Sequence, residues 1–180
     1  MKYLALLRGI NVGGKNIVKM PDLRACFERL SLNNVTTYIQ SGNVLFDTGF
    51  RNPGTLSNVI EEAVTAEFGW TSLVVIVPEK QIERVVKLAP PGFGAHPAQC
   101  RYDVVFIKRP LRARHILPTI SLHDEVDEAC EGNGVLYFTR LKEKSTQSHL
   151  RRLINNPAYR SMTIRNWNTT TELYRLMNRR

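Results

Sequence analysis

The sequence predicts an α+β fold made of two tandem β-α-β-β-α-β units and an additional C-terminal helix. Short apolar runs typical of strands alternate with segments of helical periodicity, once in residues 1–90 and again in residues 101–166. A turn-rich linker, residues 91–100, separates a first domain (1–90) from a second (91–180). The hairpin sequences "SGNVLF" and "GNGVLYF" are similar, which indicates an internal duplication. This element order is that of the ferredoxin-like plait.

The first half contains four predicted strands and two predicted helices. Pro21 stands where proline favours the first turn of a helix, and Asn52 before Pro53 predicts an N-cap followed by a first-turn proline. Ser41-Gly42 separates two apolar runs in the manner of a tight hairpin. The expected strands are residues 2–9, 35–40, 43–48 and 72–78.

The second half repeats this order after a helix that Pro90 and Pro91 end. Thr169 is followed three residues later by Glu172, which predicts a capping box for the closing helix. The expected strands are residues 102–107, 125–130, 135–140 and 161–166, and the expected helices between them are residues 111–118 and 145–154.

Basic residues are concentrated in the last part of the chain. The net charge of the 180 residues is +9, and residues 140–180 alone hold ten basic and two acidic side chains. Such a surface favours acidic partners, so weak and nonspecific nucleic-acid binding is one expectation. A basic solubilising face explains the same composition, and the predicted strands carry no aromatic RNA-binding motif.

The residues show no pattern of a metal site, a cofactor site or a membrane segment. Cys26, Cys100 and Cys130 are far apart and form no C-x-x-C pair, which favours a reducing compartment. The apolar run near the N-terminus is too short for a signal peptide, so we expect a cytoplasmic protein with no membrane partner. "HDEVDEACE" predicts an exposed acidic edge strand rather than metal ligands, because Asp127 and Glu128 face opposite sides of a strand.

The candidate site is the stretch "LLRGINVGGKN" after the first strand. In the predicted topology, strands one and two are parallel and end at the same edge, so this loop lies beside the hairpin "QSGN". The amino end of the next helix would point to the same place and favour an anion. The candidate ligand-binding residues are Arg8, Asn11, Gly13, Gly14, Lys15, Gln40, Ser41, Gly42 and Asn43.

Three hypotheses for this loop stay open. We prefer a binding module for a phosphate- or carboxylate-bearing ligand, with Arg8 and Lys15 supplying the charge. The alternative is an enzyme that acts on a small phosphorylated substrate in the manner of acylphosphatase, with Asn43 orienting water, although no general base accompanies these residues. A purely structural role is the third, since glycine pairs and "SGN" commonly form turns.

A second candidate cluster is the motif "RNWNT" before the last helix. Trp167 can stack on a base or sugar with polar neighbours beside it. The preferred interpretation is structural: Trp167 packs at the strand–helix junction while Asn168 or Thr169 caps the helix. The cluster comprises Arg165, Asn166, Trp167, Asn168 and Thr169.

The chain resembles a known family along nearly its whole length. The segments "ALLRGINVGGKNIVKMPDLR", "TYIQSGNVLF" and "TIRNWNTTTEL" are similar to the family called domain of unknown function 1697. The resemblance implies a soluble bacterial protein with a two-part α+β fold of plait-like repeats, and it implies no activity or cofactor. It covers the loop residues named above together with Gly9, and the motif from Arg165 to Thr169.

Overall fold

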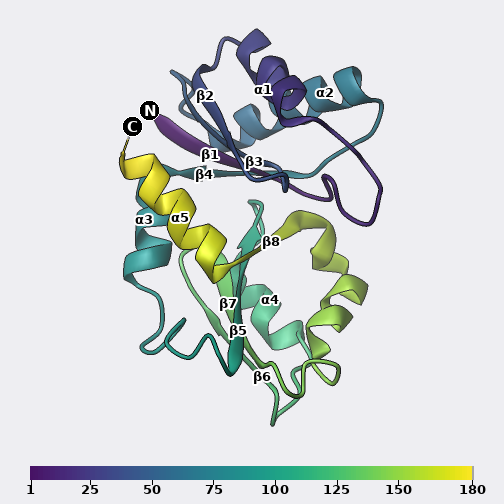
Figure 1. Cartoon of the computed structure of the whole chain (residues 1–180), viewed down its shortest axis with the longest axis vertical. Helices are drawn as coiled ribbons and strands as arrows, with labels where there is room; N and C mark the ends of the chain where they lie inside the picture. Colours follow the sequence, from purple (N-terminus) through teal and green to yellow (C-terminus); the bar gives the residue numbers. More distant parts are fainter. Residues whose placement is uncertain (180) are drawn as a thin grey trace. The chain divides into compact units, whose positions relative to one another are not determined.

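The computed structural model describes residues 1–179, which form two four-stranded antiparallel sheets with several helices (Figure 1). This mixed architecture confirms the predicted α+β class. The first sheet has the order β2-β3-β1-β4 and the second β6-β7-β5-β8. The first comprises β1 (Lys2–Leu7), β2 (Asn33–Tyr38), β3 (Asn43–Asp47) and β4 (Val74–Pro78). The second comprises β5 (Cys100–Ile107), β6 (Asp127–Glu131), β7 (Val135–Leu141) and β8 (Met162–Asn166).

Two helices, α1 (Met20–Arg29) and α2 (Pro53–Phe68), cover one face of the first sheet (Figure 1). The Asn52 side chain caps α2 by accepting from the backbone N–H groups of its first turn, and Gly69 ends the helix with a φ of 75°. Phe27 of α1 meets Phe46 of β3 edge to face, with ring centroids 5.7 Å apart. Burial of these apolar side chains contributes about 1.5–3 kcal/mol each and holds the layers together.

The remaining helical segments are α3 (Glu79–Lys87), α4 (Ala113–Ile116), η1 (Leu117–Thr119), η2 (His149–Asn155), η3 (Pro157–Ser161) and α5 (Trp167–Asn178), where η marks a 3-10 helix. The segments between β5 and β8 are shorter than the sequence predicts. The segment expected as a helix at 145–154 is helical only from His149, and it is a 3-10 helix. Ser148 and Asn156 each accept a hydrogen bond from the backbone two residues later, which starts new short turns and breaks a continuous α-helix.

A second apolar cluster lies on one face of the second sheet. Val105, Leu136 and Phe138 of the strands pack with Ile116 of α4 and Leu153 of η2. The short helical segments thus cover one face of the second sheet, as α1 and α2 cover one face of the first. The opposite face is covered partly by residue Phe93, whose ring contacts three aromatic rings edge to face: those of Tyr102, Tyr137 and Trp167.

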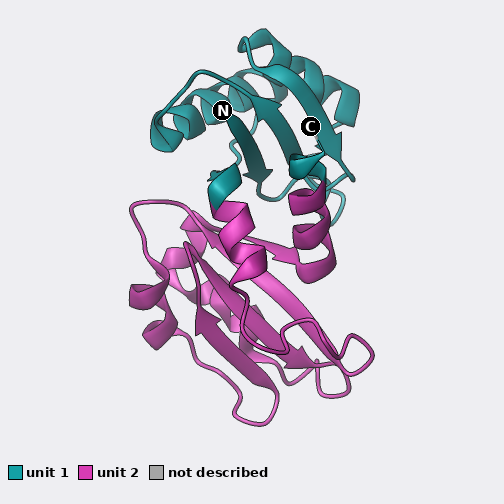
Figure 2. Ribbon diagram, turned by 90° about the vertical axis from the view of Figure 1, so that its left-hand side faces the viewer, with its two compact units in different colours: residues 1–80, 176–180 teal, residues 81–175 magenta. Residues whose placement is uncertain are grey.

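The chain divides into two compact units (Figure 2). Unit 1 contains residues 1–80 and the last residues from Leu176, and unit 2 contains residues 81–175. Both divisions fall inside helices, namely α3 and α5. Within unit 1, the Lys2 ammonium donates to the carbonyl of Met177 at 3.2 Å. The expected linker, residues 91–100, lies within unit 2.

Two local predictions about side chains are wrong. Asn166, not Asn168 or Thr169, caps α5, because its side-chain oxygen accepts from the Thr169 N–H at 2.7 Å and the helix begins at Trp167. β6 is an edge strand as expected, but Asp127 is buried in it. The Asp127 carboxylate accepts from the backbone of His123 and His149 and from Ser148, so it organises a loop instead of facing solvent.

The length and apolarity of a helix determine whether it can cross a membrane. Across residues 1–179, none of the helices combines the length and the apolarity that crossing a bilayer requires.

Candidate functional site

The loop after β1 and the turn between β2 and β3 lie against each other, as the topology predicts. The Leu7 N–H donates to the Gly42 carbonyl at 2.8 Å, and the Asn11 amide donates to the Gln40 carbonyl at 2.9 Å. We call residues 8–19 and 39–43 the loop pair. Two loops far apart in sequence therefore form one surface of unit 1.

Gly13 and Gly14 form the tip of a small hairpin within the loop pair. Their φ values are 60° and 72°, and the Lys15 N–H closes the turn on the Val12 carbonyl at 3.1 Å. Two consecutive positive φ values are those of a type I′ turn, which Gly-Gly favours. No atom lies within 4 Å of a Cβ built on either glycine, so the tip is open to solvent.

Asn11 and Asn16 hold the loop in shape. The Asn11 side chain accepts from the Val18 N–H at 2.8 Å and donates to the Val18 carbonyl at 3.0 Å. The Asn16 amide donates to the Gly9 carbonyl at 3.1 Å. Both asparagines have positive φ, near 53° and 51°, which this residue type tolerates better than most. Their amides are therefore used to satisfy loop backbone groups.

The "QSGN" turn is packed tightly against the end of β1. A Cβ on Gly42, whose φ is 70°, would lie 3.0 Å from the Leu7 Cβ. Asn43 is fully buried, and its amide donates to the Tyr38 carbonyl and the Ser41 hydroxyl. Ile39 has a φ of 48°, which is strained for a β-branched side chain. The surrounding hydrogen bonds hold this strained turn in place.

The positive charges of the loop pair lie on side chains. Lys15 and Lys19 are exposed, and Arg8 is half-buried. The start of α1 adds little, because Lys19 gives no side-chain cap, Pro21 lacks an N–H and Asp22 places a carboxylate in the first turn. An anion at this surface would therefore depend on the cationic side chains more than on the helix end that the sequence suggested.

Apolar side chains are also exposed on the loop pair. Val12, Ile17 and Ile39 are 62%, 75% and 49% exposed. The sequence offered no signal for this feature, because each residue reads as an ordinary loop or strand position. The surface combines cationic and apolar groups on a backbone that the Asn11 and Asn16 side chains hydrogen-bond.

The "RNWNT" residues lie in unit 2 and mainly serve its structure. Arg165 is buried in β8 and donates to the Thr163 hydroxyl and the Ile164 carbonyl, both at 2.8 Å. Burial lowers the pKa of its guanidinium to about 10. Trp167 contacts Phe93 edge to face with centroids 5.0 Å apart, while Asn168 is exposed.

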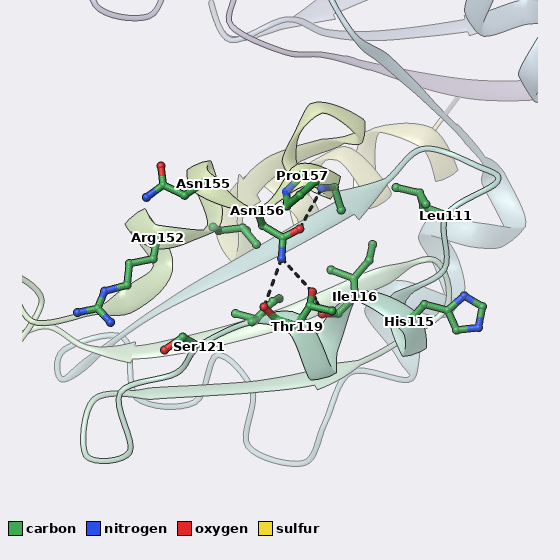
Figure 3. A pocket seen from close by; sticks show the side chains of 12 residues that line it. Leu111, His115, Ile116, Thr119, Ser121, Arg152, Asn155, Asn156 and Pro157 are labelled. Carbon is green, nitrogen blue, oxygen red and sulfur yellow. Dashed lines mark hydrogen bonds between the residues drawn. The ribbon is translucent and has the colours of Figure 1, made fainter.

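The sequence motifs do not mark the cavities that lie in unit 2. One of about 720 Å³ lies between the α4–η1 and η2–η3 segments (Figure 3). Another of about 590 Å³ is lined by residues of the 90–102 segment and of β6, including Tyr102 and Glu128. Within residues 1–179, no three His, Cys, Asp or Glu side chains are grouped as metal ligands would be.

Most of the chain matches a known family model. Residues 1–137 match the family model described as "Protein of unknown function (DUF1697)". The chain belongs to this family. The resemblance seen in the sequence is thereby confirmed, and the match spans the whole loop pair.

The chain is similar to a solved structure, that of the conserved bacterial protein SP0830 from Streptococcus pneumoniae. The two share 27% sequence identity over 98% of each chain, with a TM-score of 0.84. No curated protein matches the chain. The similarity therefore extends to the whole two-sheet architecture and includes both units.

Proposed function

We propose that the protein is a binding module for an anionic ligand that carries a phosphate or carboxylate group, recognised at the loop pair. The Asn11–Gln40 hydrogen bond is the observation that carries this proposal, because it joins the two loops into one surface. Arg8 and Lys15 supply the charge, Arg8 with a planar fork and Lys15 as a point charge.

Hydrogen bonding within the loop pair supports a binding role. The Asn11 and Asn16 amides and the Gly13-Gly14 turn fix the backbone before any ligand arrives. A preorganised site loses less conformational entropy on binding, so more of the contact energy appears as affinity. Strained residues such as Ile39 often lie at such sites, because the surrounding structure must hold them.

We also infer that the halves are two tandem ferredoxin-like plaits that arose by duplication. In support, each sheet has its third strand between its first and second, and its fourth strand beside its first. Each half also has a helical segment after its first strand and another after its third.

Two alternatives are less well supported. The acylphosphatase-like hypothesis needs Asn43 to orient water, but Asn43 is fully buried with its amide engaged. Nucleic-acid binding would use exposed basic residues of the second half, such as Arg151 and Arg160. The logarithm of the binding constant for duplex DNA would fall with the logarithm of the salt concentration by about 0.9 per phosphate contact. Fluorescence anisotropy at several salt concentrations measures this slope.

The test is thermal unfolding of the full chain with inorganic pyrophosphate, and with citrate as the carboxylate probe. At a hundredfold excess over Kd, the anion should stabilise the fold by about 2.7 kcal/mol. Lys15→Gln should weaken the binding about tenfold or more, because it removes a charge-assisted contact. The stabilisation at a fixed anion concentration should fall accordingly.

Lys80→Gln is the matched control. Lys80 is exposed and follows β4 at the end of the sheet opposite Leu7, since β4 pairs antiparallel with β1. Equal losses in both variants would refute a local site and indicate a general charge effect. Absence of stabilisation by either anion in the wild type would also reject the proposal.

The unliganded Arg8→Ala variant separates a ligand-binding from a structural role of that arginine. A ligand-binding Arg8 leaves the unliganded melting temperature nearly unchanged. If Arg8 holds the fold through a buried ion pair, its loss costs about 3–5 kcal/mol. That result would assign the loop pair to structure.

A further inference from the structure

The 720 Å³ cavity of unit 2 is a concave surface distinct from the loop pair (Figure 3). One wall is formed by α4 and η1 and the other by η2 and η3. Ile116 and Leu153 are buried members of the apolar cluster beneath it, and Leu111, Ile120 and Ala158 extend the apolar lining. Its volume is in the range of small-molecule sites, about 300–1,000 Å³.

Asn156 joins the two walls. Its amide nitrogen donates to the Thr119 hydroxyl at 2.9 Å, and its oxygen accepts from the Ala158 N–H at 2.9 Å. The Thr119 hydroxyl in turn donates to the Ile116 carbonyl at 2.7 Å. Figure 3 shows the bonds that run from Asn156 to Thr119. The two walls are therefore linked to each other by a direct hydrogen bond without a ligand.

The ionisable groups of the lining are basic. Arg152 and His115 are the ionisable side chains among the twelve lining residues, which include no carboxylate. They lie at opposite ends of the cavity in Figure 3, with Ser121 toward the Arg152 end. The Nε2 atom of His115 accepts from the Arg114 guanidinium at 3.1 Å, which leaves Nδ1 as the ring donor in the neutral form.

We propose that this cavity binds a small apolar anion, with an aromatic or branched aliphatic body and one carboxylate or sulfonate group. The body lies on the apolar lining around Ile116 and Leu153, and the anionic group pairs with the Arg152 guanidinium. Arginine suits this task because its planar fork matches the geometry of such oxygens. A cationic ligand has no counter-charge in the lining, and a fully polar anion leaves its apolar surface unused.

The experiment uses two fluorescent probes on the full chain. Anilinonaphthalene sulfonate is an apolar anion, and phenylnaphthylamine is the same aromatic body without the sulfonate. The anionic probe should bind at least about tenfold more tightly, a difference of about 1.4 kcal/mol. Arg152→Gln should remove that difference and leave the affinity for the neutral probe unchanged.

Arg151→Gln is the matched control, because Arg151 is the exposed neighbour outside the lining. It should leave the affinities for both probes unchanged. Equal losses in the Arg151 and Arg152 variants would overturn the cavity proposal.

Mapping by amide NMR gives an independent result that needs no variant. Addition of anilinonaphthalene sulfonate to the wild type should shift the backbone signals of the cavity segments, residues 111–121 and 152–158, while the spectrum stays dispersed. Shifts confined to other segments, or equal affinity for the neutral and anionic probes, would overturn the proposal.

Discussion

Replacing Tyr137 by phenylalanine should destabilise unit 2 by a predictable amount. The buried Tyr137 hydroxyl donates to the Val85 carbonyl at 2.7 Å and so connects β7 to α3. Val85 lies in the last turn of α3, where carbonyl groups have no partner within the helix. The tyrosine therefore satisfies a helix end that would otherwise be buried without a partner.

The size of the effect follows from what the substitution leaves behind. The phenylalanine ring keeps the edge-to-face contact with Phe93, whose centroid is 5.1 Å away, so packing changes little. The Val85 carbonyl loses its donor in a buried place, which costs about 1–3 kcal/mol. We therefore expect Tyr137→Phe to lower the free energy of unfolding by that amount, measured by urea denaturation.

Alkaline titration provides a second measurement. Burial, with a smaller contribution from Cys130, raises the pKa of Tyr137 to about 12. Because the folded state keeps this proton longer than the unfolded state, whose pKa is about 10, the stability from Tyr137 falls as pH rises between these values. Ultraviolet titration should show a tyrosine ionising near pH 12 in the wild type that is missing from Tyr137→Phe.

Tyr38→Phe is the control, because Tyr38 is half-buried at the end of β2 and makes no such bond to a helix end. Its stability should stay within about 0.5 kcal/mol of the wild type. If Tyr137→Phe also stayed within about 0.5 kcal/mol of the wild type, the hydroxyl would not be needed at the end of α3, and an unpaired Val85 carbonyl would carry no cost.

Two further predictions concern a buried carboxyl group and a turn. Burial raises the pKa of Asp103, and the Arg140 guanidinium at 2.9 Å opposes this shift. NMR titration should therefore find the pKa of Asp103 above its usual range, and Arg140→Met should raise that pKa further. The stability linked to Asp103 should then be full at low pH and fall as pH rises toward the raised pKa; a pKa below the usual range would contradict this. Gly42→Ala should destabilise the protein by about 1–3 kcal/mol more than Gly14→Ala, because both have positive φ but only Gly42 is crowded. Equal thermal shifts in the two variants would show that crowding is not the cause.

The sequence contains most of the information for the sheets. The buried runs of β1 and β4 and the Ser41-Gly42 turn are local signals, so the strands and the first hairpin follow directly from them. The contact between the two loops followed from topology alone, because parallel strands one and two end at the same edge.

Other features depend on contacts between distant residues. "GG" fits both a ligand loop and a tight turn, and only the φ values of Gly13 and Gly14 distinguish them. The helical period of residues 149–155 is satisfied by a 3-10 helix as well as by an α-helix. The hydrogen bond that links the two cavity walls joins Thr119 and Asn156, which are 37 positions apart. No local sequence pattern predicts a contact over that separation.

The discontinuity of unit 1 has a consequence for synthesis on the ribosome. All of β1 to β4 emerges early, but the contact between Lys2 and Met177 cannot form until the whole of unit 2 has been translated. That contact closes a loop of 175 residues, and the entropic cost of closure rises with the logarithm of loop length. Prior folding of residues 81–175 shortens the flexible part of this loop. Unit 2 is therefore expected to fold before unit 1 gains its contact between Lys2 and Met177, although the strands of unit 1 are translated first.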